Sequence, residues 1–87
     1  MNLESGVPFR MHPHIICQVI RSNCQDPPVI YLIVDSKKTA DSLLIALTKT
    51  KVDFKYLTAK LCYKTVSRFV LPVILREILE SIVKEKL

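Results

Sequence analysis

Runs of apolar residues predict two strands in the first third of the chain. Residues 15–21 are largely apolar and rich in β-branched side chains, and residues 29–34 are six apolar residues in succession. The sequence between them, SNCQDPP, is typical of a turn. Because the second run does not alternate between apolar and polar residues, we expect a central strand that is buried on both faces or paired along both edges.

A helical pattern follows this strand over residues 37–50. Ser36 precedes the pattern and is a predicted N-cap, because its hydroxyl is placed to accept a hydrogen bond from a backbone N–H in the first turn. The apolar residues recur at the i, i+3, i+4, i+7 spacing of one helix face: Ala40, Leu43, Leu44 and Leu47.

Residues 52–61 predict a third strand. Val52, Phe54 and Tyr56 share one side, and lysines dominate the other side and the loop beyond it. We expect the two aromatic side chains to pack in the core rather than to stack on nucleic-acid bases.

A second predicted helix ends near Lys86, and Pro72 leaves its start open between two alternatives. Either Pro72 occupies the first helical position, so that the helix begins near Leu71, or it kinks a helix that begins near Thr65.

The order of elements is then strand, strand, helix, strand, helix. This order predicts an α/β fold, a two-layer sandwich in which two helices cover a short mixed sheet. Residues 14–87 form the single domain, and residues 1–13 form a flexible N-terminal arm.

The last helix carries more apolar residues than one sheet is able to cover. In a chain of 87 residues, the simplest second packing surface is another copy of the chain. We therefore expect a homodimer whose interface includes the following residues: Val70, Ile74, Ile78, Leu79 and Ile82.

Charge is concentrated in the middle of the chain. The whole sequence has a formal net charge of +5, whereas residues 36–68 contain eight basic residues and two acidic ones, a net charge of +6. Lys37 and Lys38 open the first predicted helix, where the positive end of the helix dipole disfavours cations and favours an anion. Lys60, Lys64 and Arg68 add charge from a loop that we expect to lie nearby. This pattern predicts contacts with a phosphate backbone.

The composition argues against an enzyme. Gly6 is the one glycine of the sequence, so no glycine-rich phosphate cradle or dinucleotide fingerprint exists, and no pair of carboxylates with a plausible acid or base partner is evident. We expect no catalytic residue, no cofactor and no small-molecule substrate.

Histidine and cysteine do not follow a metal-ligand pattern. The spacing of His12, His14, Cys17 and Cys24 matches none of the usual zinc motifs, and Cys62 is expected to be incidental. Three cysteines and the lack of a leader sequence predict reduced thiols and a cytoplasmic location, and the longest apolar run is too short to cross a membrane.

Residues 31–78, YLIVDSKKTADSLLIALTKTKVDFKYLTAKLCYKTVSRFVLPVILREI, resemble the Alba superfamily of small archaeal chromatin and RNA-binding proteins. The similar parts are a strand, a paired-lysine turn, a helix, a second strand and a basic loop that leads into a second helix. By this resemblance, Lys37 and Lys38 fall where the family's paired lysines contact nucleic acid. The loop over residues 60–64 has neither the glycine nor the arginine of the family's loop, and the family's closing hairpin has no counterpart after the last predicted helix.

The sequence thus predicts a dimeric protein that binds DNA or RNA through phosphates. Sequence specificity should be low, because residues 36–68 contain one arginine and no asparagine or glutamine to read base edges. The alternative is a protein–protein interaction module or accessory subunit that docks a partner on the wide apolar face of the last helix.

Overall fold

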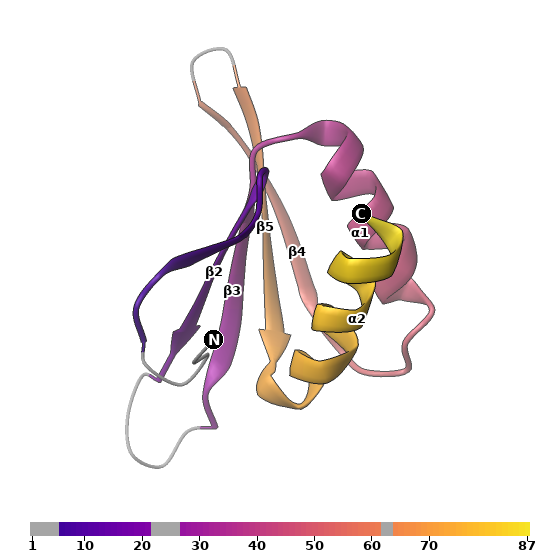
Figure 1. The fold of residues 1–87 in the computed structure, drawn as a ribbon. Coiled ribbons are helices and arrows are strands. Elements are labelled where there is room, and N and C mark those ends of the chain that lie inside the picture. Colours follow the sequence, from indigo (N-terminus) through magenta and orange to yellow (C-terminus); the bar gives the residue numbers. More distant parts are fainter. Residues whose placement is uncertain (1–5, 22–26, 62–63) are drawn as a thin grey trace.

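A computed structural model describes residues 6–21, 27–61 and 64–87, and in these residues five strands form one antiparallel sheet with two helices on one of its faces (Figure 1). The strand order across the sheet is β1-β2-β3-β5-β4. The elements are β1 Phe9–His12, β2 Ile15–Ile20, β3 Val29–Val34, α1 Lys37–Thr48, β4 Lys55–Leu61, β5 Lys64–Pro72, the 3-10 turn η1 Val73–Leu75, and α2 Arg76–Lys86.

The central strand is β3, as its apolar run predicts. It pairs antiparallel with β2 along one edge and with β5 along the other. Ile30, Leu32 and Val34 are fully buried beneath the helices, whereas Val29, Tyr31 and Ile33 point to the opposite face and keep part of their surface exposed. The run lacks alternation because both faces of this strand are apolar.

The core lies between the sheet and the two helices. Paired residues of antiparallel strands point to the same face, so the register sets one inward row across all five strands: Phe9, Cys17, Leu32, Phe69 and Tyr56. Helix α1 adds Ala40, Leu43 and Leu47, and α2 adds Leu79 and Ile82. The ring of Tyr56 lies 4.7 Å from that of Phe69, centroid to centroid, which confirms that this aromatic packs in the core.

The sheet differs from the prediction in strand order and direction. Three strands rather than two precede α1, and all pairings are antiparallel, so the sheet is not mixed. The additional strand β1 lies in residues 1–13, for which the sequence predicts a flexible arm. Phe9 and Met11 alternate with polar neighbours and pack against the core, and this burial holds β1 against β2.

The second difference is β5, where the sequence predicts a loop and the start of a helix. Ser67, Phe69 and Leu71 are buried and alternate with residues on the other face, and β5 pairs with both β3 and β4. Pro72 neither opens nor kinks a helix. It ends the strand with φ −64° and ψ 147°, and η1 begins at the next residue.

The second helix is therefore shorter than expected, and the third predicted strand begins at Lys55 rather than at residue 52. In the described part of the chain, neither helix is long and apolar enough to span a membrane.

Replacement of Ser36 by alanine should destabilise the fold by about 1 kcal/mol, because Ser36 caps α1. Its Oγ accepts a hydrogen bond from the backbone N–H of Thr39 at 3.4 Å. The measurement is urea unfolding of the wild type, Ser36→Ala and Ser42→Ala. Ser42 lies inside α1, where alanine is the better helix former, so this control should lose no stability. Equal unfolding midpoints for wild type and Ser36→Ala would argue against the cap.

Candidate functional site

The first turn of α1 has two lysines and no acidic residue. Ser36 has the extended backbone of an N-cap, and its carbonyl accepts the first helical hydrogen bond from Ala40 N–H at 2.9 Å. Lys37 and Lys38 are exposed, and neither forms an ion pair with a described residue. Their charges therefore add to the positive end of the helix dipole, and this arrangement favours an anion at the start of α1.

The carboxylate that immediately precedes this helix start in the sequence contacts a histidine. Asp35 immediately precedes the N-cap, and its Oδ1 lies 2.9 Å from Nδ1 of His14. The backbone N–H of Asp35 also donates to the carbonyl of His14 at 3.1 Å. These two contacts fix the residue that leads into α1 against the start of β2, so the orientation of the helix start is set by the sheet.

The β4–β5 hairpin carries three of the predicted basic residues. β3 pairs with β5 only as far as Ser67, so the last pairs of the hairpin, Lys60 with Thr65 and Leu61 with Lys64, form a two-stranded projection beyond the main sheet (Figure 1). Lys60 and Lys64 are both exposed on it.

The structure brings this projection to the same end of the sheet as the start of α1. Val34, the last residue of β3, pairs with Ser67, so the chain that leaves β3 for α1 and the hairpin that enters β5 lie side by side (Figure 1). Lys37 is three residues after Val34, and Lys64 is three residues before Ser67. We call this part of the molecule, defined by Lys37, Lys38, Lys60, Lys64 and Arg68, the basic end.

The five residues of the basic end do not share one face. Lys60 pairs with Thr65, which is on the same side of β5 as the buried Ser67, so Lys60 lies on the helix side with the start of α1. Lys64 and Arg68 alternate with these residues and lie on the opposite side of the sheet.

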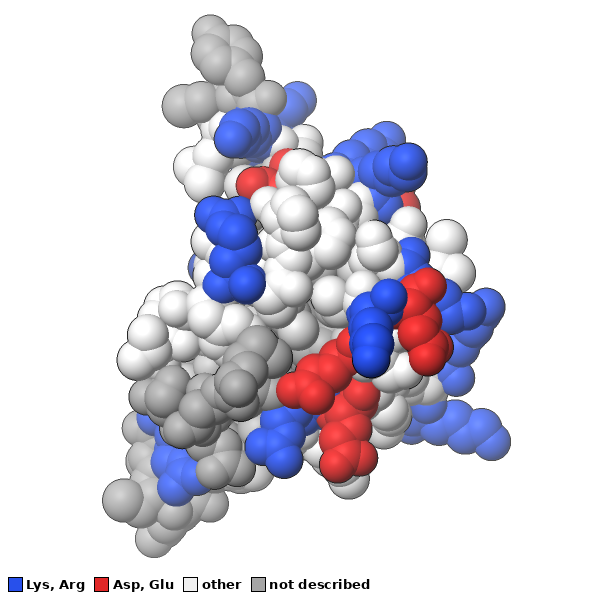
Figure 2. Space-filling model, in the orientation of Figure 1, with Lys and Arg blue, Asp and Glu red and all other residues white. Residues whose placement is uncertain are grey.

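Acidic side chains gather elsewhere. Figure 2 shows a red cluster over the part of the molecule where α2 lies, and blue side chains at the upper end and around much of the rest of the visible face. Helix α2 contains Glu77, Glu80 and Glu85. These glutamates lie away from the end that carries the hairpin, and α2 also contains Arg76, Lys84 and Lys86.

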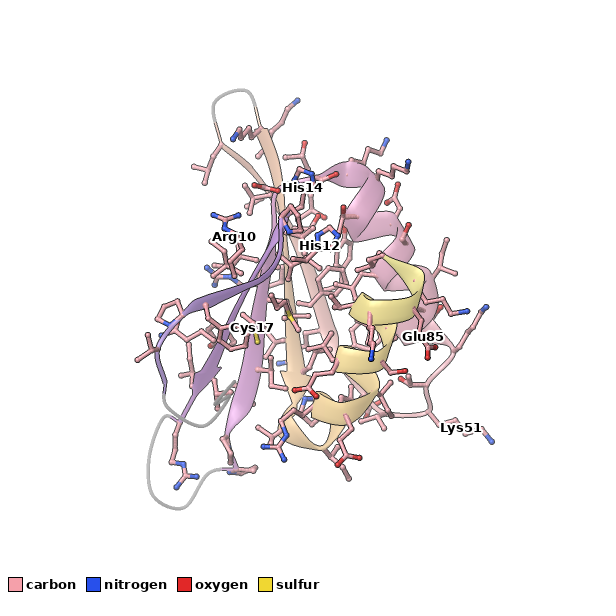
Figure 3. All side chains as sticks on the ribbon, viewed as in Figure 1. Arg10, His12, His14, Cys17, Lys51 and Glu85 are labelled. Carbon is pink, nitrogen blue, oxygen red and sulfur yellow. The ribbon has the colours of Figure 1, made fainter. Side chains whose placement is uncertain are left out.

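Sequence reasoning missed one basic residue, Arg10. It lies on β1 and pairs with Ile16, and the labelled side chain points away from the helices in Figure 3. Its Nη1 donates a hydrogen bond to the carbonyl of Pro13 at 2.9 Å. Alternation in the sequence FRMH, with Phe9 and Met11 on the side opposite Arg10, is the signal that indicates a strand here.

Residues predicted for a dimer interface are divided among different environments. Val70 lies on β5, on the sheet face away from the helices, and Leu79 and Ile82 are buried in the core of the protomer. Ile74 in η1 and Ile78 in α2 remain exposed, at 77% and 42% of their surface. Two of the five predicted interface residues are thus used within one chain, whereas Ile74 and Ile78 stay on its surface.

Cys17 is buried beside the helices, and burial, with a smaller contribution from the charge of Glu80, raises the pKa of its thiol from 9.0 to about 11. A protonated, buried thiol is neither a nucleophile nor a metal ligand. In the described residues, no three histidine, cysteine, aspartate or glutamate side chains lie together as metal ligands. Cys24 and Cys62 lie outside these residues.

No protein-family model, curated protein or solved structure matches this chain. The resemblance of residues 31–78 to the Alba superfamily therefore stays a prediction.

The raised pKa of Cys17 should make the fold less stable in alkali. A thiol whose pKa is higher in the folded state contributes stability that is complete below pH 9.0 and is lost as the pH rises through about 11. Over this window, the wild type should lose roughly 2 to 3 kcal/mol more than Cys17→Val, in which the thiol is absent. Urea unfolding of both proteins at a series of pH values measures the difference. Parallel curves would show that Cys17 titrates normally.

Proposed function

We propose that this protein binds nucleic acid through the phosphate backbone at its basic end. The observation that carries the proposal is the position of Lys37 and Lys38, at the capped start of α1 and beside the projecting β4–β5 hairpin with Lys60. Two segments that are more than twenty residues apart in sequence thus present positive charge on the same side of one end of the sheet.

The electrostatics of α1 support an anionic ligand. Unpaired lysines in the first turn of a helix are unfavourable by a few tenths of a kcal/mol each, and a phosphate that accepts from the first backbone N–H groups reverses the sign of this interaction. Asp35 contacts His14, and the first turn of α1 contains no acidic residue.

Low sequence specificity follows from the side chains present. Lysine is a point charge that suits phosphate, whereas arginine, asparagine and glutamine read base edges with two hydrogen bonds. Lysines make up the helix side of the basic end, and the guanidinium of Arg68 lies over the ring of Tyr31, 5.6 Å from its centroid. We therefore expect similar affinity for different sequences of the same nucleic acid.

A second candidate function is docking of a partner protein. The observation that favours it is the exposure of Ile74 and Ile78 beside the more polar surface of α2. Apolar docking and phosphate binding respond differently to salt, because the affinity for phosphates falls steeply as salt rises.

The double substitution Lys37→Ala, Lys38→Ala should weaken nucleic-acid binding and its salt dependence together. Each lysine that neutralises a phosphate contributes about 0.9 to the slope of log affinity against log salt on duplex DNA and about 0.7 on a single strand. Loss of both should flatten the slope by roughly 1.5 to 2 units per bound protomer. Gel-shift titrations with duplex DNA, single-stranded DNA and structured RNA at several salt concentrations measure it.

Lys49→Ala, Lys51→Ala is the matched control. It removes the same charge at the opposite end of α1, where Lys49 is the C-cap, so it should change the slope much less than the first pair. Equal effects of the two pairs would indicate a response to net charge rather than a site at the helix start. Absence of binding to all three probes by the folded wild type would refute the proposal.

A further inference from the structure

The face of the sheet that no described helix covers is unusually apolar. The register sets one row across all five strands, in the order Arg10, Ile16, Ile33, Arg68 and Leu57. An antiparallel sheet with helices on one side normally has polar residues on its solvated side. Here two basic residues are the only polar members of the central row.

The neighbouring rows continue this surface. Gln18, Tyr31, Val70 and Lys55 form the next row, and Ala59 and Val66 lie opposite each other toward the hairpin. We call the whole surface the open sheet face.

Several large side chains are exposed on the open sheet face. Ile33 exposes 36% of its surface, Leu57 54% and Leu61 65%, and a hollow there is lined by these three residues with Ala59, Val66 and Arg68. Contiguous apolar patches of more than a few hundred Å² are rare on monomeric proteins and mark interaction sites.

The charged residues lie mostly around the apolar centre. Arg10 is on the edge strand β1, Lys55 begins the other edge strand β4, and Lys64 lies toward the tip of the hairpin. Arg68 is the exception, and its guanidinium lies over the ring of Tyr31. An apolar centre within a polar rim is the anatomy of a protein–protein interface. No acidic residue lies in the described strands of this face.

The extent of the open sheet face is close to the lower limit of what a stable dimer needs. Five strands about 4.8 Å apart and about six residues long span roughly 24 by 20 Å, or about 500 Å² in projection. Two such faces give about 1,000 Å² in projection, and side chains that stand up from the sheet make the accessible area larger. The total is therefore close to the lower end of the roughly 1,200–2,000 Å² that stable interfaces bury.

We infer that two copies of this chain pack face to face through the open sheet face. A copy offers a surface of the same extent, the same twist and the same apolar centre, and two sheets of like twist pack in an aligned sandwich about 10 Å apart. The inference does not depend on nucleic-acid binding, and it moves the interface from the last helix, where sequence analysis placed it, to the opposite side of the molecule.

The charge of the open sheet face gives this dimer a distinctive response to salt. The charged residues in the described strands of this face are all basic. In a face-to-face dimer the rims of the two copies therefore repel each other, through Arg10, Lys55 and Lys64, and added salt screens this repulsion. The dimer should therefore become tighter as salt rises. A complex with a different protein whose carboxylates meet the same basic rim should become weaker.

Sedimentation equilibrium of the whole protein at low and high salt tests the inference, together with Leu57→Lys. Leu57 is more than half exposed on an edge strand, where lysine is well tolerated, so the protomer should still fold. Two buried lysines per dimer should raise the dissociation constant by about tenfold or more. Ile74→Lys makes a comparable apolar-to-lysine change on the helix side and should leave the dissociation constant unchanged.

Leu61→Lys is a second test on the same face, at a residue that exposes 65% of its surface. It replaces Leu57→Lys if circular dichroism shows that Leu57→Lys does not fold. A wild-type dimer that tightens with salt and is weakened by either substitution on the open sheet face supports the inference. The inference is overturned if the wild type stays monomeric at high micromolar concentration in both salts, or if its dimer weakens as salt rises. It is also overturned if Ile74→Lys dissociates the dimer while Leu57→Lys and Leu61→Lys do not.

Discussion

The simultaneous pairing of β3 with β2 and β5 is the constraint on which the rest of the structure depends. It buries Ile30, Leu32 and Val34 under the helices and so fixes where α1 and α2 pack. Because Val34 pairs with Ser67, it also fixes that α1 starts beside the base of the β4–β5 hairpin. The same pairing turns the other half of the strand to the uncovered face. One strand thus determines the core, the basic end and the open sheet face.

The parts of the fold that local chemistry specifies were predictable, and those that depend on long-range pairing were not. The cap at Ser36 and the apolar spacing of α1 are signals within a few residues, and both are confirmed. The sequence does not predict strand β5, because its apolar residues continue without a break into η1 and α2 and this continuous pattern also fits a helix. The alternation of Ser67, Phe69 and Leu71 is the signal for a strand. Strand β1 was missed because four residues next to turn formers carry little signal, and its stability comes from packing against β2.

The same distinction applies to the candidate site. The sequence identifies Lys37 and Lys38 as cations at a helix start, because that depends only on where the helix begins. It does not tell on which side of the sheet Lys60, Lys64 and Arg68 lie, since this follows from the register of a strand that was assigned to a loop. The residues expected at the helical interface do not share one surface of the protomer, for a related reason. With Pro72 at the end of a strand, Val70 and Leu79 belong to different elements and point to different sides of the molecule.

The residues of the basic end are divided between two faces of the sheet, and only those on the helix side stay accessible in a face-to-face dimer. In a face-to-face dimer, Arg68 and its neighbour Tyr31 lie within the interface, so the guanidinium is not free to contact phosphate. Arginine is suited to this position, because its guanidinium is weakly hydrated and stacks on aromatic rings. Lys37, Lys38 and Lys60 stay outside the interface on the helix side of each copy. Phosphate contacts and self-association then use opposite sides of one sheet, and a nucleic acid bound at Lys37, Lys38 and Lys60 does not compete with the second copy.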